Sequence, residues 1–237
     1  MIKRKRYLHR GIEYIFRWND RNHEKLKISS DNSTLIKLWN FFERVKKGDI
    51  PNNLFNDYSV PRVSQFKLTN IHPKFINSLR TKLIRQGKIK VLKDDSKYSK
   101  MAQVAENNLK GVNIKTNHEN ILNNILINDP ESLAIEVPIW NRGQYGPLTG
   151  HIDLIQANGD TIKVIDYKPE KRFLRSLPQV AMYGFLLKKL FRVAKLRCVS
   201  FNSREAWEYD PEILMTDLKE FLNTHGIKEI EWEKFLL

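Results

Sequence analysis

Residues 150–170, GHIDLIQANGDTIKVIDYKPE, constrain the fold more than any other stretch of the chain. Two apolar runs flank the dipeptide Asn158-Gly159. An Asn-Gly pair in this setting is the strongest short-range signal for a β-hairpin with a two-residue type I′ turn. Such a turn would set residue 157 opposite residue 160. Because the turn fixes the register, it also fixes which side chains of the two strands share a face of the sheet.

Three charged side chains interrupt these apolar strands. In the predicted register Asp153 lies opposite Val164, and Asp166 lies opposite His151. Side chains alternate along each strand, so Asp153, Asp166 and Lys168 are expected on one side of the sheet. The two aspartates would then be diagonal neighbours with Cα atoms roughly 7–8 Å apart. The apolar residues on both faces predict that the sheet is covered on both sides.

Two carboxylates held together under such cover repel each other and lose hydration. A divalent cation relieves both penalties, and Mg²⁺ prefers carboxylate oxygens. Lys168 could form an ion pair with Asp166, or it could neutralise a phosphate and orient a water molecule at the ion. The alternative is a surface hairpin whose charges pair for solubility, which the apolar flanks disfavour.

The charge balance indicates a polyanionic partner. The chain has 237 residues, and its 41 Lys and Arg against 27 Asp and Glu give a formal net charge of +14. This charge points first to nucleic acid and less strongly to an anionic membrane surface, with simple solubility as the alternative. A single cysteine, Cys198, excludes a disulfide framework, a cysteine-ligated zinc site and an iron–sulfur cluster. No apolar run approaches the roughly 20 residues of a membrane span, so a cytoplasmic, DNA-associated protein is expected.

The periodicity of the chain predicts an α/β fold. From about residue 100, helices at 117–127, 177–193 and 211–225 alternate with strands at 132–140, 195–201 and 206–210. This alternation is typical of a mixed central sheet flanked by helices. Residues 1–104 are expected to form a basic α+β region, a candidate for DNA binding, and residues 105–237 the core. Within that region the expected elements are a strand at 12–18, helices at 33–48 and from 72, a short strand after Gly87, and a loop at 49–61.

Four polar elements follow one another in a fixed order over roughly residues 105–195. They are His118 in TNHENIL, Asp153 in GHIDL, Asp166 and Lys168 in VIDYK, and Gln179 and Tyr183 in PQVAMYGF. With these elements the chain resembles the PD-(D/E)XK nuclease superfamily, and specifically its RecB-like exonuclease branch. The resemblance implies a restriction-endonuclease-like core. Pro169 departs from the branch, which commonly has Thr or Ser followed by Gly after the lysine, and no phosphate-loop motif of a helicase motor occurs.

The resemblance implies a metal centre that holds one or two Mg²⁺ or Mn²⁺ ions. The implied ligands are His118, Asp153, Asp166 and the backbone carbonyl of Tyr167. The catalytic residues would be Asp153, Asp166 and Lys168, with the lysine orienting the water that attacks phosphorus. A histidine satisfied within the core is the alternative for His118.

Other residues are expected to act around this centre. Gln179 and Tyr183 share a helix face, and in the family such a pair contacts the substrate strand or holds the site together. Glu136 could approach the metal, or it could be exposed on an edge strand. The basic side chains expected to attract the substrate are Lys171, Arg172, Arg175 and the run Lys3, Arg4, Lys5 and Arg6. A solvated face is the alternative for either run, and disorder for the second.

The implied activity is metal-dependent hydrolysis of DNA phosphodiester bonds. The Gln-x-x-x-Tyr element favours exonuclease, flap or end processing on single-stranded DNA, for example in DNA repair. A structure-specific DNA endonuclease is one alternative. The other is a catalytically silent subunit that binds nucleic acid and acts with a helicase partner.

Overall fold

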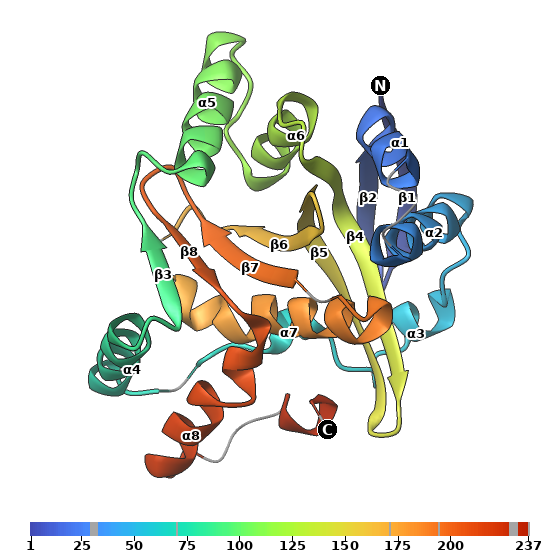
Figure 1. Ribbon diagram of the computed structural model, residues 1–237. Helices are drawn as coiled ribbons and strands as arrows, with labels where there is room; N and C mark the ends of the chain where they lie inside the picture. Colours follow the sequence, from blue (N-terminus) through green and yellow to red (C-terminus); the bar gives the residue numbers. More distant parts are fainter. Residues whose placement is uncertain (29–32, 70, 171, 194, 228–231, 237) are drawn as a thin grey trace.

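The structure is a computed structural model that describes residues 1–28, 33–69, 71–170, 172–193, 195–227 and 232–236. Within these residues an eight-stranded sheet has the order β1-β2-β4-β5-β6-β7-β8-β3 (Figure 1). Its strands are β1 Ile2–His9, β2 Ile12–Asn19, β3 Ile89–Leu92, β4 Ser132–Gly143, β5 Gly146–Asn158, β6 Thr161–Tyr167, β7 Lys195–Phe201 and β8 Ala206–Tyr209.

Helices precede and connect these strands. The α-helices are α1 Asp20–Ile28, α2 Ser33–Lys47, α3 Asn52–Asn56, α4 Pro73–Arg85, α5 Lys97–Gly111, α6 His118–Asn128, α7 Phe173–Phe191 and α8 Asp217–Thr224. Short 3₁₀ turns are η1 Val63–Gln65, η2 Pro211–Leu214 and η3 Glu233–Phe235. None of these helices combines the length and apolar character that crossing a membrane requires.

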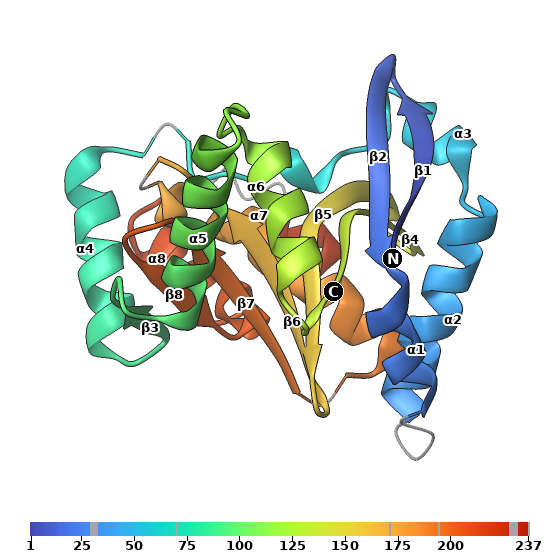
Figure 2. The same ribbon diagram turned by 90° about the horizontal axis from the view of Figure 1, so that it is seen from above.

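The sheet is mixed, because β6 and β7 run parallel while the other neighbouring strands run antiparallel. The crossover between β6 and β7 contains α7, as parallel neighbours require. Figures 1 and 2 show α5 and α6 together and α7 apart from them. One apolar cluster joins α5 and α6 to the sheet, and the other joins α7, α2 and α8 to it. The predicted mixed sheet with cover on both faces is therefore confirmed.

The central hairpin forms, but its register differs from the predicted one. Asn158 pairs with Thr161, so the turn consists of Gly159 and Asp160. Gly159 has φ +57, a conformation that glycine adopts without steric cost, whereas Asp160 has no positive φ. This is the pattern of a type II′ turn and not of type I′. The shift moves each partner by two residues, an even number, so the side chains keep their predicted faces.

Other differences concern segments whose local pattern was weak. The basic run at residues 3–6, for which disorder was an alternative, lies inside β1 and pairs with β2. The predicted helix at 211–225 is interrupted, since η2 ends at Leu214 and α8 starts at Asp217. The predicted loop at 49–61 contains the short helix α3, and α5 was not predicted at all.

Candidate active site

Four polar side chains converge at the end of the central hairpin. Asp153 belongs to β5, Asp166 is the second-last residue of β6, Lys168 follows β6, and His118 is the first residue of α6. The Nε2 atom of His118 donates to Asp153 Oδ2 over 2.8 Å, and Lys168 Nζ donates to Asp166 Oδ1 over 2.9 Å. The structure thus brings together the residues for which a metal and catalytic role was predicted.

The sheet itself sets the two carboxylates side by side. The ladder between β5 and β6 ends at the pair Leu154 and Ile165. Asp153 and Asp166 are the next residues on the two strands, so they face each other directly instead of diagonally as predicted. Asp166 is only 1% exposed. On its other side its strand pairs with Ser200 of β7, which makes it part of the sheet interior.

The electrostatics reflect two anions confined with two cations. Burial and the neighbouring Asp153 carboxylate raise the pKa of Asp166 to about 7, against the opposing charge of Lys168. Burial would also raise the pKa of Asp153, but the hydrogen bond and charge of His118 outweigh it and lower that pKa. For His118 and Lys168 burial acts to lower the pKa, yet the carboxylates prevail and both pKa values rise. The cluster therefore holds cations where two carboxylates would otherwise repel each other.

The donor set fits a divalent cation. Asp166 Oδ2 is buried and has no hydrogen-bond partner among the described residues. Such an orphaned carboxylate oxygen costs free energy unless a cation or water meets it. No group of three or more His, Cys, Asp or Glu side chains in the described ranges stands in ready ligand geometry. His118 and Lys168 contact one oxygen of each carboxylate, Asp153 Oδ2 and Asp166 Oδ1, and leave Asp166 Oδ2 open.

Glu136 approaches the same centre through a distorted strand. Its φ is +51, a left-handed conformation that is rare for a residue with a side chain and typical of functional sites. In a regular strand Ile135 and Val137 would share a face, but here they belong to the two opposite apolar clusters. The two neighbours of Glu136 therefore lie on opposite faces of the sheet. Burial, followed by the charge of Asp153, raises the pKa of Glu136 to about 7.

Gln179 and Tyr183 on α7 lie beside the hairpin but are 6% and 2% exposed. Burial raises the pKa of Tyr183, although hydrogen bonds to the His151 backbone and the Gln179 side chain oppose this rise. A Cβ atom at Gly150 would stand only 2.6 Å from Cε1 of the Tyr183 ring. This packing favours the second of the two predicted roles, which is to hold the site together.

A basic hollow of about 400 Å³ opens beside Lys168. Its lining includes Arg172 and Arg175, both predicted to attract the substrate, and also Lys67. The Leu68 amide donates to the Arg175 carbonyl over 2.9 Å, which ties the segment around Lys67 to the start of α7. Lys67 was missed because no local pattern marks it. The predicted residue Lys171 lies outside the described residues. Tyr167 ends β6 between the aspartate and lysine, and the role of its carbonyl stays a prediction.

Comparison with known proteins agrees with this geometry. The family model described as the PD-(D/E)XK nuclease superfamily matches residues 104–221, about half of the chain. The mixed sheet flanked by helices is consistent with the core of that superfamily. Searches of curated proteins and of solved structures gave no match. The superfamily suggests a nuclease, and its members usually use divalent metal ions. The segment from residue 104 to residue 221 is thus similar to the PD-(D/E)XK nuclease superfamily.

Proposed function

We propose that this chain is a Mg²⁺- or Mn²⁺-dependent deoxyribonuclease of the RecB-like kind, which shortens single-stranded DNA from its ends or at flaps. The observation that carries the proposal is the buried pair Asp153 and Asp166, with Lys168 and His118 in contact and one carboxylate oxygen left without a partner. If this cluster had no catalytic role, burying two carboxylates that repel each other would only lower the stability of the fold.

The ligands proposed for the ion are Asp153, Asp166, His118 and the Tyr167 carbonyl, with Glu136 as a further carboxylate. When bound, a divalent ion would polarise the phosphodiester and stabilise charge on the leaving oxygen. His118 would have to release Asp153 before its own nitrogen could act as a ligand. Lys168, whose raised pKa keeps it cationic, would neutralise a phosphate oxygen and orient the attacking water.

The substrate would enter through the basic hollow. Arg172, Arg175 and Lys67 line it beside Lys168, and Lys171 is adjacent in sequence. Cations beside the reacting phosphate attract a nucleic-acid strand whatever its sequence. Gln179 and Tyr183 would keep the hairpin in place behind this entrance. A helicase that opens duplex substrates is the protein partner proposed for this activity.

The test incubates wild type and Asp166→Ala with end-labelled linear, flap and circular single-stranded DNA and with linear RNA, in Mg²⁺ and in Mn²⁺. A matched control is Asp160→Asn in the turn of the same hairpin, where Asp160 pairs with Lys195 at 2.8 Å. Shortening of linear and flap DNA by wild type and control alone, with circles intact, is the expected result. Cleaved circles would favour the endonuclease, and equal products from wild type and Asp166→Ala would end the proposed role of this site.

A further inference from the structure

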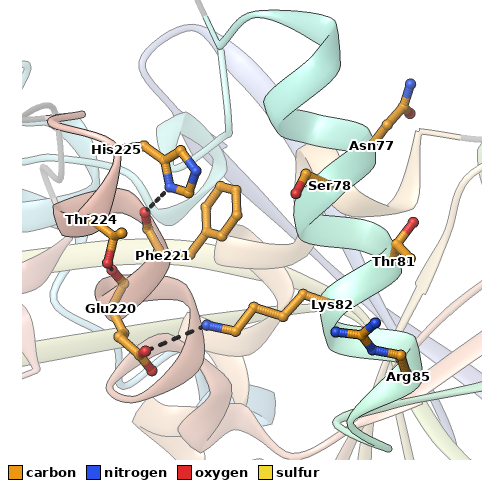
Figure 3. Close-up of a pocket in the computed structure, with 9 residues that line it drawn as sticks. All are labelled: Asn77, Ser78, Thr81, Lys82, Arg85, Glu220, Phe221, Thr224 and His225. Carbon is orange, nitrogen blue, oxygen red and sulfur yellow. Dashed lines mark hydrogen bonds and ion pairs between the residues drawn. The ribbon is translucent and has the colours of Figure 1, made fainter.

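A polar groove lies between α4 and α8. None of its lining residues also lines the hollow beside Lys168. Its volume is about 570 Å³. Lys82 and Arg85 extend from α4 toward α8, as Figure 3 shows. Ser78 and Thr81 add hydroxyl groups from α4, while the Thr224 hydroxyl on α8 donates to the Glu220 carbonyl over 2.8 Å. Cations and hydroxyl donors along one groove are the groups that contact a phosphate backbone.

The charge of α4 is one-sided. Its sequence PKFINSLRTKLIR contains four basic residues and no acidic one. Lys82 meets Glu220 at 3.5 Å, a partner whose side chain is largely exposed. The Arg85 side chain has no hydrogen bond or ion pair with the described residues, so its donors are available to a ligand. Leu79 and Leu83 are buried on the opposite side of α4 and anchor the helix.

The exposed ring of Phe75 contacts His225, a lining residue of this groove. Phe75 is 39% exposed, and its ring meets that of His225 edge-on at 4.9 Å. The His225 ring also stacks on Phe221 at 4.1 Å. Its Nδ1–H donates to the Phe221 carbonyl over 2.8 Å, which leaves Nε2 free for a ligand (Figure 3). An exposed aromatic ring beside a basic groove is the arrangement that binds single-stranded nucleic acid, because bases stack on the ring while cations follow the backbone.

Contacts connect α4 to the entrance of the candidate active site. Arg80 lies over the Trp207 ring at 5.5 Å, and that ring meets Phe173 edge-on at 5.5 Å. Phe173 is the first residue of α7, and Arg175, in the same first turn, lines the basic hollow. The α4 helix is thus one aromatic layer away from the hollow. These contacts connect α4 to the start of α7, where Arg175 lines the hollow.

We propose that the groove between α4 and α8 is a second contact site for single-stranded DNA, which holds the part of the substrate strand beyond the reacting phosphate. Lys82 and Arg85 contact phosphates, and Phe75 stacks on a base. This inference rests on the proposed nuclease function for its ligand, but the groove is distinct from the catalytic centre. It explains why α4, which lies outside the candidate active site, carries four basic residues and no acidic one.

The test measures binding in the Asp166→Asn background, so that hydrolysis does not interfere. The probe is fluorescent oligothymidine of about 20 nucleotides, longer than the roughly 4–16 nucleotides that one single-strand site covers. Lys82→Gln/Arg85→Gln should weaken binding about tenfold at moderate salt and reduce the salt slope by about 1.4. Phe75→Ala should weaken single-strand binding roughly fivefold or more and leave duplex binding unchanged. Lys100→Gln/Lys110→Gln on α5 removes the same charge from exposed positions and should change affinity less than twofold.

A short oligothymidine of about 5 nucleotides separates the two sites, because it is too short to span both. For cleavage assays the groove substitutions are made in protein that retains Asp166. These variants should cleave the short oligothymidine as fast as wild type does, but they should process the long strand less efficiently. Groove variants that bind the long strand as tightly as wild type would overturn the second site. Protein that binds the long strand through the groove but cleaves nothing would instead end the proposed nuclease function and leave this inference standing. Circular dichroism of each variant verifies that the fold is retained.

Discussion

Replacing Asp166 by asparagine should abolish cleavage and at the same time stabilise the metal-free protein. The native carboxylate is buried beside Asp153, and its Oδ2 atom has no partner among the described residues. An asparagine has the same shape, keeps an oxygen that can accept from Lys168, and offers an amide donor toward Asp153. The substitution therefore removes the repulsion and retains the contacts.

The size of the gain follows from the pKa of Asp166. The ordinary value is 3.8, and burial together with Asp153 raises it to about 7. The pKa of Asp166 is higher in the folded protein than in the unfolded one, so the folded protein binds the Asp166 proton more tightly. The contribution of Asp166 to stability therefore rises as pH falls from about 7 toward 4. Above pH 7 the folded state holds an anion that the environment disfavours, a cost of at most about 4 kcal/mol at 1.36 kcal/mol per pKa unit. Loss of the charged partner of Lys168 offsets part of this, so a net gain of roughly 1–3 kcal/mol is expected.

Urea denaturation in EDTA at about pH 8 and at about pH 5 measures this difference. At the higher pH Asp166→Asn should unfold at higher urea than wild type, and at the lower pH the two curves should approach each other. When Mn²⁺ replaces EDTA, the free energy of unfolding of wild type should rise by mass action, and that of the variant should rise much less. Asp160→Asn in the exposed turn should follow wild type under all these conditions. An Asp166→Asn protein less stable than wild type at the higher pH without metal would refute the reasoning, since it would show that the carboxylate is stabilised where it lies.

Three further substitutions test neighbouring features. Gly150→Ala should destabilise the fold by about 1–3 kcal/mol in urea denaturation, because its Cβ must displace the Tyr183 ring, whereas Gly111→Ala, with open space around it, should be near neutral. Glu136→Gln should weaken Mn²⁺ binding in calorimetry and leave the unfolding midpoint at neutral pH equal or higher; unchanged binding would exclude Glu136 as a ligand. Burial lowers the pKa of His23 to about 3, so the contribution of His23 to stability should fall by up to about 1.4 kcal/mol per pH unit between pH 6 and 3, and in acid denaturation His23→Gln should lose less stability than wild type over this range.

The local part of the site was predictable and the non-local part was not. The alternation of apolar residues around Asp153 and Asp166 predicts both the hairpin and the shared face of the two acids, and both hold in the structure. The register was misjudged by two residues because Asn158-Gly159 and Gly159-Asp160 both supply a glycine to a two-residue turn. The choice between them depends on the packing of the whole sheet.

Features that depend on distant segments left no trace in the local pattern. Lys67 enters the basic hollow only because its segment is tied to α7 by the bond from Leu68 to Arg175. The left-handed backbone at Glu136 depends on how β4 fits between its neighbours, which periodicity does not encode. The sequence therefore offered Glu136 as a candidate without its backbone conformation, and it did not offer Lys67.

The N-terminal strands support the candidate site even though they lie outside the matched segment. On β2, Arg17 pairs with Ile135 of β4, directly before the distorted residue Glu136. The Arg17 guanidinium also reaches Glu119 at 2.5 Å, and Glu119 follows His118 on α6. Arg17 thus connects the strand that carries Glu136, through its backbone, to the helix that carries His118, through its side chain. Removing β1 and β2 would leave β4 as an unpaired edge and free that helix end, so the N-terminal strands are expected to hold Glu136 and His118 in position at the candidate site.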